Sequence, residues 1–198
     1  SDAAARSASG QSFSFTLPDL STVSMTLKTT LNAGSGTALV TKSVPSWSGS
    51  AFGVTAFLNI PGRPVLYSAN QGSTVTVTLS GITVAPPPGG TGIAKYAIVV
   101  ADGESSNTNE TLSFTTNADS WVQLSKIQNG SSTLYPALTG LGTKTVTETG
   151  AAGTMGSFVF GSFNNPTSIS STFKAGGLQG FIVGVRYASI SVVSQITG

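Results

Sequence analysis

Residues 74–85 read Thr-Val-Thr-Val-Thr-Leu-Ser-Gly-Ile-Thr-Val-Ala, and this stretch decides the fold class. From Thr74 to Leu79, polar and apolar side chains alternate strictly, which is the period of a β-strand with one buried face. Ser80-Gly81 then shifts the phase before Ile82 and Val84. One extra residue turns the following side chains to the other face, so we predict a β-bulge at this point.

The same period-two alternation recurs towards both ends of the chain. It runs through Phe13 and Phe15, through Val23, Met25 and Leu27, and through 181–187. Turn-forming residues interrupt it at 32–36, 61–64 and 86–90. No stretch longer than about two turns has the apolar spacing of a helix. We therefore predict an all-β fold, a two-sheet antiparallel β-sandwich of lectin-like or jelly-roll type, with little helix.

A length of 198 residues suits one domain, and the turn-rich breaks are too short to be linkers. We expect a single sandwich over 1–198, with 1–10 as a flexible N-terminal segment. The longest apolar runs, such as 97–101, are far too short to span a bilayer, so no membrane insertion is expected. We interpret the chain as a monomeric domain within a longer surface protein, whose anchor lies outside this sequence.

The composition restricts the chemistry. Only 8% of residues are charged, against about 25% in an average soluble domain, and serine and threonine exceed a quarter of the chain. Cysteine and histidine are absent, which removes thiol nucleophiles, the commonest metal ligand and the usual general base. The nine basic residues are scattered, which disfavours nucleic-acid binding. This hydroxyl-rich, charge-poor composition is typical of extracellular proteins and indicates that the chain is not an enzyme.

One continuous apolar run, 96–101, fits a central strand buried on both faces. It is followed by Asp-Gly-Glu-Ser-Ser-Asn-Thr-Asn-Glu at 102–110, which we call the acidic loop. Calcium prefers such oxygen ligands, although the spacing is not that of an EF-hand. There are two alternatives to calcium binding. Asp102, Glu104, Asn107 and Asn109 could contact a ligand directly, or the loop could simply be solvated. The candidate calcium ligands are Asp102, Glu104, Asn107, Asn109 and Glu110.

Two aromatic residues stand in turn-like contexts and are candidate ligand-binding residues. Trp47 lies in Pro-Ser-Trp-Ser-Gly, and Tyr135 precedes a proline. An exposed ring offers a flat face to a sugar or an anchor to a protein partner, whereas a packed ring only closes the loop. Trp121, at the start of an expected strand, is assigned to the core.

Catalytic patterns are weak. Asp102, Glu104 and Glu110 are close in sequence, but a glycosidase pair needs a shaped pocket. No histidine can activate a serine, and no nucleophile elbow is present. A Lys–Asn isopeptide crosslink would compensate for the missing disulfides, and Lys28 or Lys174 could supply the lysine, although nothing in the sequence selects either.

Six blocks of sequence, taken in order and spacing, resemble one family. They are PSWSGSAFG (45–53), IPGRPVLY (60–67), VVADGE (99–104), NETLSFTT (109–116), GLGTKTVTETG (140–150) and GLQGFIVGVR (177–186). Together they resemble the ligand-binding, non-repetitive domain of CshA-type fibrillar adhesins of Gram-positive bacteria. The similarity extends over nearly the whole chain.

This resemblance implies a lectin-like sandwich displayed at the tip of a cell-wall-anchored surface fibril. It implies non-covalent attachment to a host matrix glycoprotein, with fibronectin as the ligand associated with the family. No binding motif of the family can be transferred residue by residue. A lectin module that recognises glycans directly, with or without calcium, and a structural stalk domain are the alternative functions.

Overall fold

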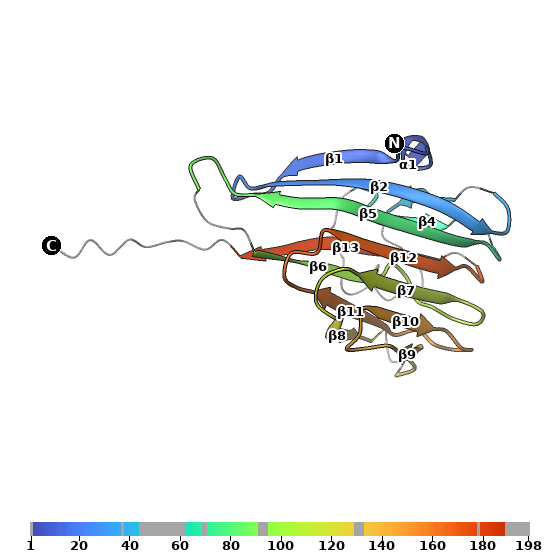
Figure 1. Ribbon diagram of the computed structural model, residues 1–198. Coiled ribbons are helices and arrows are strands. Elements are labelled where there is room, and N and C mark those ends of the chain that lie inside the picture. The colour runs from blue at the N-terminus through green and yellow to red at the C-terminus, as the bar shows by residue number, and fades with distance from the viewer. Residues whose placement is uncertain are drawn as a thin grey trace.

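The computed structural model describes residues 2–36, 38–43, 62–68, 71–90, 95–128, 133–177 and 179–188. These residues form one four-residue helix and a series of antiparallel strands (Figure 1). The elements are α1 (Asp2–Ala5), β1 (Gln11–Thr16), β2 (Thr22–Ala33), β3 (Val40–Lys42), β4 (Val65–Ser68), β5 (Thr74–Ala85), β6 (Lys95–Asp102), β7 (Thr111–Thr116), β8 (Val122–Ile127), β9 (Ala137–Thr139), β10 (Thr145–Thr149), β11 (Ser157–Ser162), β12 (Ser168–Lys174) and β13 (Gln179–Ala188).

The strands form two sheets. The seven-stranded sheet has the order β1-β2-β5-β12-β7-β10-β9, and the six-stranded sheet has the order β3-β4-β13-β6-β11-β8. All strand pairs among the described residues are antiparallel, and several neighbours lie far apart in sequence, such as β5 and β12. The predicted two-sheet antiparallel sandwich with little helix is confirmed.

The strand that decides the fold class behaves as its sequence predicts. In β5, Val75, Val77 and Leu79 are buried, while the threonines between them face outward. The register against β2 then shifts, since Thr26 pairs with Ser80 but Ser24 pairs with Thr83. Gly81 lies in this extra step with a φ of 60°, a left-handed conformation that glycine adopts at little cost. The β-bulge is confirmed.

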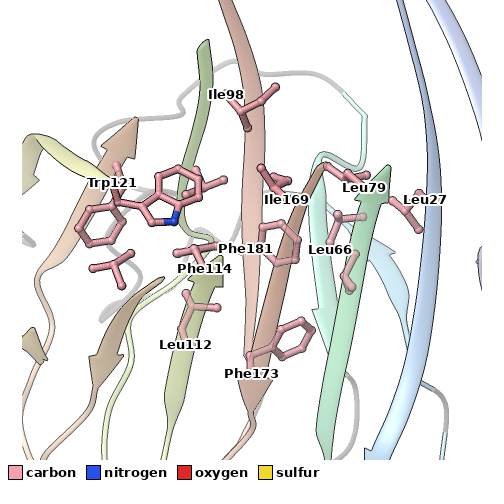
Figure 2. Close-up of a cluster of buried hydrophobic side chains, with 14 of the residues drawn as sticks. Leu27, Leu66, Leu79, Ile98, Leu112, Phe114, Trp121, Ile169, Phe173 and Phe181 are labelled. Atoms are coloured by element: carbon pink, nitrogen blue, oxygen red, sulfur yellow. The ribbon is translucent and has the colours of Figure 1, made fainter. Parts of the chain in front are cut away.

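Aromatic side chains fill the space between the sheets (Figure 2). Phe114 of β7 lies 6.1 Å from the ring of Trp121 and 5.7 Å from that of Phe181 in β13 of the other sheet. Tilted and edge-on contacts of this kind are the favoured geometries of aromatic pairs. Trp121 is fully buried, so its assignment to the core is confirmed.

The segment before β1, for which we expect flexibility, contains the helix α1 and contacts the rest of the fold. The Asp2 carboxylate accepts hydrogen bonds from the backbone and hydroxyl of Thr41, both at 3.1 Å. The Arg6 guanidinium donates to the carbonyl of Leu39 at 2.6 Å, and Ala5 is buried. No helix among the described residues has the length and apolar character needed to cross a bilayer.

Candidate functional site

The outward side of the seven-stranded sheet carries an ordered array of hydroxyl groups. Because β-branched threonine fits a pleated surface, alternation puts Ser and Thr on this side of nearly every strand. The strand register then aligns them into two rows that cross the sheet. One row is Thr30, Thr76, Thr172, Ser113, Thr147 and Thr139, and the other is Lys28, Thr78, Ser170, Thr115 and Thr145. We call these two rows the hydroxyl face.

Neighbouring hydroxyl groups on this face bond to one another. Thr76 and Thr172 lie 2.8 Å apart, Ser113 and Thr147 2.7 Å, and Thr115 and Thr145 2.9 Å, each measured between side-chain oxygens. A hydroxyl group in such a pair still has a further position at which it can donate or accept a hydrogen bond. The face therefore presents hydrogen-bonding groups in fixed positions, with Lys28 as the one charge in the two rows.

The hydroxyl face continues towards the edge strand β1. Ser12 and Ser14 bond to Thr26 and Ser24 of β2, and these strands line an open depression with Gly81 at its side. The alternate residues of β1, Phe13 and Phe15, are 39% and 44% exposed. These two exposed rings make the edge a second candidate contact surface.

The acidic loop is not a solvated loop, because its three carboxyl groups are buried while its asparagines are exposed. Asp102 is completely inaccessible, and its two oxygens accept hydrogen bonds from the Glu104 backbone at 2.9 Å and the Ser106 hydroxyl at 2.7 Å. Burial raises the pKa of Asp102 to about 7, because desolvation outweighs these two hydrogen bonds. Asp102 therefore shapes the loop from within.

The carboxyl group of Glu104 faces Tyr67 of β4. The Tyr67 hydroxyl donates to it at 3.1 Å. Burial, followed by repulsion from Asp102 and Glu110, raises the pKa of Glu104 to about 9. Burial and the neighbouring carboxylates also raise the pKa of Tyr67, so this pair stays protonated at neutral pH.

Glu110 closes the loop. One of its oxygens accepts from the backbone of Asn107 at 2.8 Å and the other from the backbone of Gly177 at 3.0 Å. Asn109, just before it, has a φ of 68°, a conformation that asparagine tolerates better than most residues. The loop is thereby tied to the segment that leads into β13.

A fourth buried carboxyl group, that of Glu148 in β10, is not among the site residues predicted from the sequence. It is completely inaccessible, and neither of its oxygens has a hydrogen-bond partner among the described residues. Burial, with repulsion from Asp102, raises the pKa of Glu148 well above its usual range. Its signal was present in the sequence, because Glu148 shares its strand face with the buried Val146.

The candidate calcium ligands are split by this geometry. Asn107 and Asn109 are exposed, whereas Asp102, Glu104 and Glu110 are buried and bonded to the protein itself. Across the described residues, no group of three or more Asp or Glu side chains is arranged to hold a metal ion. Calcium binding by this loop stays a prediction.

Of the two loop aromatics, Tyr135 is half-buried. Its ring centroid lies 5.5 Å from that of Phe158, and the ammonium of Lys126 sits 3.9 Å from the ring. A cation therefore already covers one face of the ring, and a sugar that stacked on this face would have to displace it. Trp47 lies outside the described residues.

Comparison with known proteins finds one family. A family model described as surface adhesin CshA non-repetitive domain 2 matches residues 1–186. Neither the curated proteins nor the solved structures include a match to the chain. The matched range contains the hydroxyl face, the edge strand and the acidic loop.

Proposed function

Because the chain belongs to the family of non-repetitive domain 2 of the surface adhesin CshA, we propose that it attaches cells to a host matrix glycoprotein such as fibronectin. As a surface-adhesin domain it acts outside the cell, at the cell surface. The attachment is non-covalent and involves no catalysis on the partner. Anchoring to the wall of a Gram-positive bacterium, at the tip of a fibril, belongs to the same proposal.

The hydroxyl face is the observation that carries this proposal. It spans most strands of the larger sheet, and its hydroxyl groups are held in place by one another, so binding costs little side-chain entropy. Uncharged donors and acceptors suit peptide groups and sugar hydroxyls equally. With so few charges on the face, attachment should depend little on salt.

The edge strand β1 gives the partner a second point of contact. It is the outermost strand of the seven-stranded sheet, and Ser12, Phe13 and Ser14 line the depression. The exposed Phe13 and Phe15 alternate with these serines and pair with Met25 and Val23, so their rings lie on the inner side of the strand. An extended peptide of the matrix protein can add to such an edge through backbone hydrogen bonds, with a ring as an apolar anchor. The proposal thus combines the polar outer face of the sheet with an edge strand that has apolar rings on its inner side.

Direct glycan recognition is the alternative that a specific observation favours. Asn107 and Asn109 are exposed at the tip of the acidic loop, and amide groups pair well with sugar hydroxyls. In that case the buried Asp102 and Glu104 hold the loop in shape, with or without calcium, and Trp47 or Tyr135 supplies the ring. A structural stalk domain is the outcome if neither kind of partner binds.

A binding assay separates these functions. Wild-type protein is titrated on immobilised fibronectin before and after enzymatic deglycosylation, with free sugars as competitors. Binding that survives deglycosylation supports protein recognition. Loss of binding together with competition by sugar supports a lectin, and absence of binding to a panel of matrix proteins and glycans contradicts both.

Two matched variants locate the contact. Ser170→Arg places a long charged side chain in the middle of the hydroxyl face, on the central strand β12. Ser125→Arg makes the same change on β8, an exposed edge strand of the other sheet. We expect Ser170→Arg to weaken binding at least tenfold and Ser125→Arg to leave it unchanged, with both folds checked by circular dichroism. Equal affinities would place the contact elsewhere.

A further inference from the structure

Three buried side chains at the end of the sandwich form a continuous hydrogen-bonded chain. The Ser106 hydroxyl donates to Asp102 Oδ2 at 2.7 Å, and Gln179 Nε2 donates to the same hydroxyl oxygen at 2.8 Å. Ser106, Asp102 and Gln179 each have 0% of their surface exposed. A hydroxyl group, a carboxylate and a carboxamide are therefore in contact in a site that excludes water.

The orientation of the carboxamide is fixed. The backbone N–H of Gly180 donates to Gln179 Oε1 at 2.7 Å. Since a backbone N–H can only donate, the oxygen of the amide must lie on that side, and the nitrogen must face Ser106. The same N–H polarises the amide carbonyl and would stabilise a negative charge that develops on its oxygen.

These contacts have the parts of an acyl-transfer site. A serine hydroxyl that is hydrogen-bonded to a carboxylate is a nucleophile with its base. A carbonyl that accepts a hydrogen bond from a backbone N–H is an electrophile with its oxyanion donor. The carbonyl carbon of Gln179 lies one covalent bond beyond the nitrogen that touches Ser106 Oγ, so a small shift of the serine side chain brings the two reacting atoms into van der Waals contact.

We propose that Ser106 and Gln179 form an intramolecular ester crosslink with release of ammonia. The Oγ–H proton moves to Asp102 as Oγ bonds to Cδ of Gln179, which gives a tetrahedral oxyanion held by the Gly180 N–H. The Cδ–Nε2 bond then breaks, and the proton returns from Asp102 to the leaving nitrogen. One hydroxyl group and one carboxamide become one ester and one ammonia, with no oxidant or cofactor.

The surroundings of the site favour this reaction. Burial makes the Asp102 carboxylate more basic than an exposed one, which improves proton transfer from a hydroxyl group. Exclusion of water protects an ester from hydrolysis. The Thr154 hydroxyl donates to the carbonyl of Ser106 and holds the loop against the site. The crosslink joins the loop after β6 to the first residue of β13, across 73 positions of sequence.

Intact-mass spectrometry of purified wild-type protein decides the proposal. We expect a mass lower than that of the sequence by one ammonia, and a proteolytic fragment in which the peptides containing Ser106 and Gln179 are joined. Mild alkaline hydrolysis of the unfolded chain should then separate the two peptides and leave glutamate at position 179. A wild-type mass that equals the sequence mass, and stays there on prolonged incubation of the folded protein, overturns the proposal.

Variants identify the reacting groups. Ser106→Ala should restore the full sequence mass, whereas Ser105→Ala, one residue away, should keep the loss of ammonia. Asn129→Gln is a necessary control, because the Asn-Gly pair at 129–130 can also lose ammonia by forming a succinimide. A mass loss that disappears in Asn129→Gln but persists in Ser106→Ala assigns it to the succinimide and contradicts the ester.

Discussion

The hydroxyl face and the buried end of the sandwich divide the polar chemistry of this domain between them. The face has two rows of serine and threonine with a single lysine and no acidic residue. The buried end holds Asp102, Glu104, Glu110 and Glu148, four of the seven acidic residues of the chain. Most proteins keep carboxylates in water, where solvation is favourable. Here the hydroxyl face has almost no charge, and most of the carboxyl groups lie where burial raises their pKa.

The largest effect that tests this contrast is the pH dependence of stability. The pKa of Asp102 rises from 3.8 to about 7 on folding and that of Glu104 from 4.5 to about 9. Between these limits the folded state binds more protons than the unfolded state, so stability is greatest near pH 4–5 and falls as the pH rises through 7 to 9. One pKa unit is worth about 1.4 kcal/mol, and each kcal/mol about 2–4 °C in Tm at this length, so even half of these shifts lowers the Tm by roughly 10 °C.

Calorimetry between pH 5 and pH 9 measures this slope. Tyr67, Glu110 and Glu148 interact electrostatically with Asp102 or Glu104, so they also contribute to the pH dependence. Ser170→Arg, on the hydroxyl face, serves as the control because it changes surface charge without touching the buried end. A Tm that is constant or rises over this range would show that the carboxyl groups ionise freely in the folded protein.

Glu148 gives the next largest effect. Both of its oxygens are buried, and no residue in the described part of the chain forms a hydrogen bond with them. Replacing such a group by an apolar side chain of similar size removes the desolvation cost, so Glu148→Met should stabilise the domain by about 1–3 kcal/mol at pH 8. Urea unfolding measures the gain, which should shrink at pH 5, because protonating the carboxyl group on folding costs less free energy at lower pH.

Glu148→Gln separates charge from polarity, because it keeps the polar group and removes only the charge. We expect it to stabilise the domain less than Glu148→Met, since a buried amide without partners still loses its hydrogen bonds to water. Destabilisation of the methionine variant at pH 8 would mean that the carboxylate has a favourable partner.

The two regions also differ in how far the sequence predicts them. Alternation in 74–79 predicts which side chains of β5 face outward, and the same rule extends to Val146 and Glu148. Period two says nothing about which strands are neighbours. The rows of the hydroxyl face exist only because β5, β12, β7 and β10 are aligned in register, which depends on the whole topology.

The buried end is harder to predict, for a different reason. A segment as polar as 102–110 is normally solvated, and local composition cannot show that Glu110 reaches the backbone of Gly177. The contact of Ser106 with Gln179 likewise depends on the pairing of β6 with β13. Alternation does place Gln179 on the same strand face as the buried Phe181, which signals an inward polar side chain without naming its partner.

A threonine of the hydroxyl face should contribute little to stability. The Thr172 hydroxyl bonds to Thr76 at 2.8 Å on a half-exposed surface. Thr172→Val removes this bond but adds a side chain of high strand propensity, so the free energy of unfolding should change by less than about 0.5 kcal/mol. Urea unfolding measures this, while binding to fibronectin should fall. A loss of stability with unchanged binding would make the face a structural feature.

Calcium removal should produce the smallest effect. Calcium requires several oxygen ligands that are free to point at one ion. The oxygens of Asp102 and Glu110 already accept hydrogen bonds from the protein, and Glu104 is bonded to Tyr67. An ion that bound only the folded state would raise Tm. We expect EDTA to leave the Tm unchanged to within about 1 °C, with a titration of added calcium as the complementary measurement. A clear decrease on chelation, restored by calcium but not by magnesium, would mean that these carboxylates open towards an ion, and that the buried end binds a ligand after all.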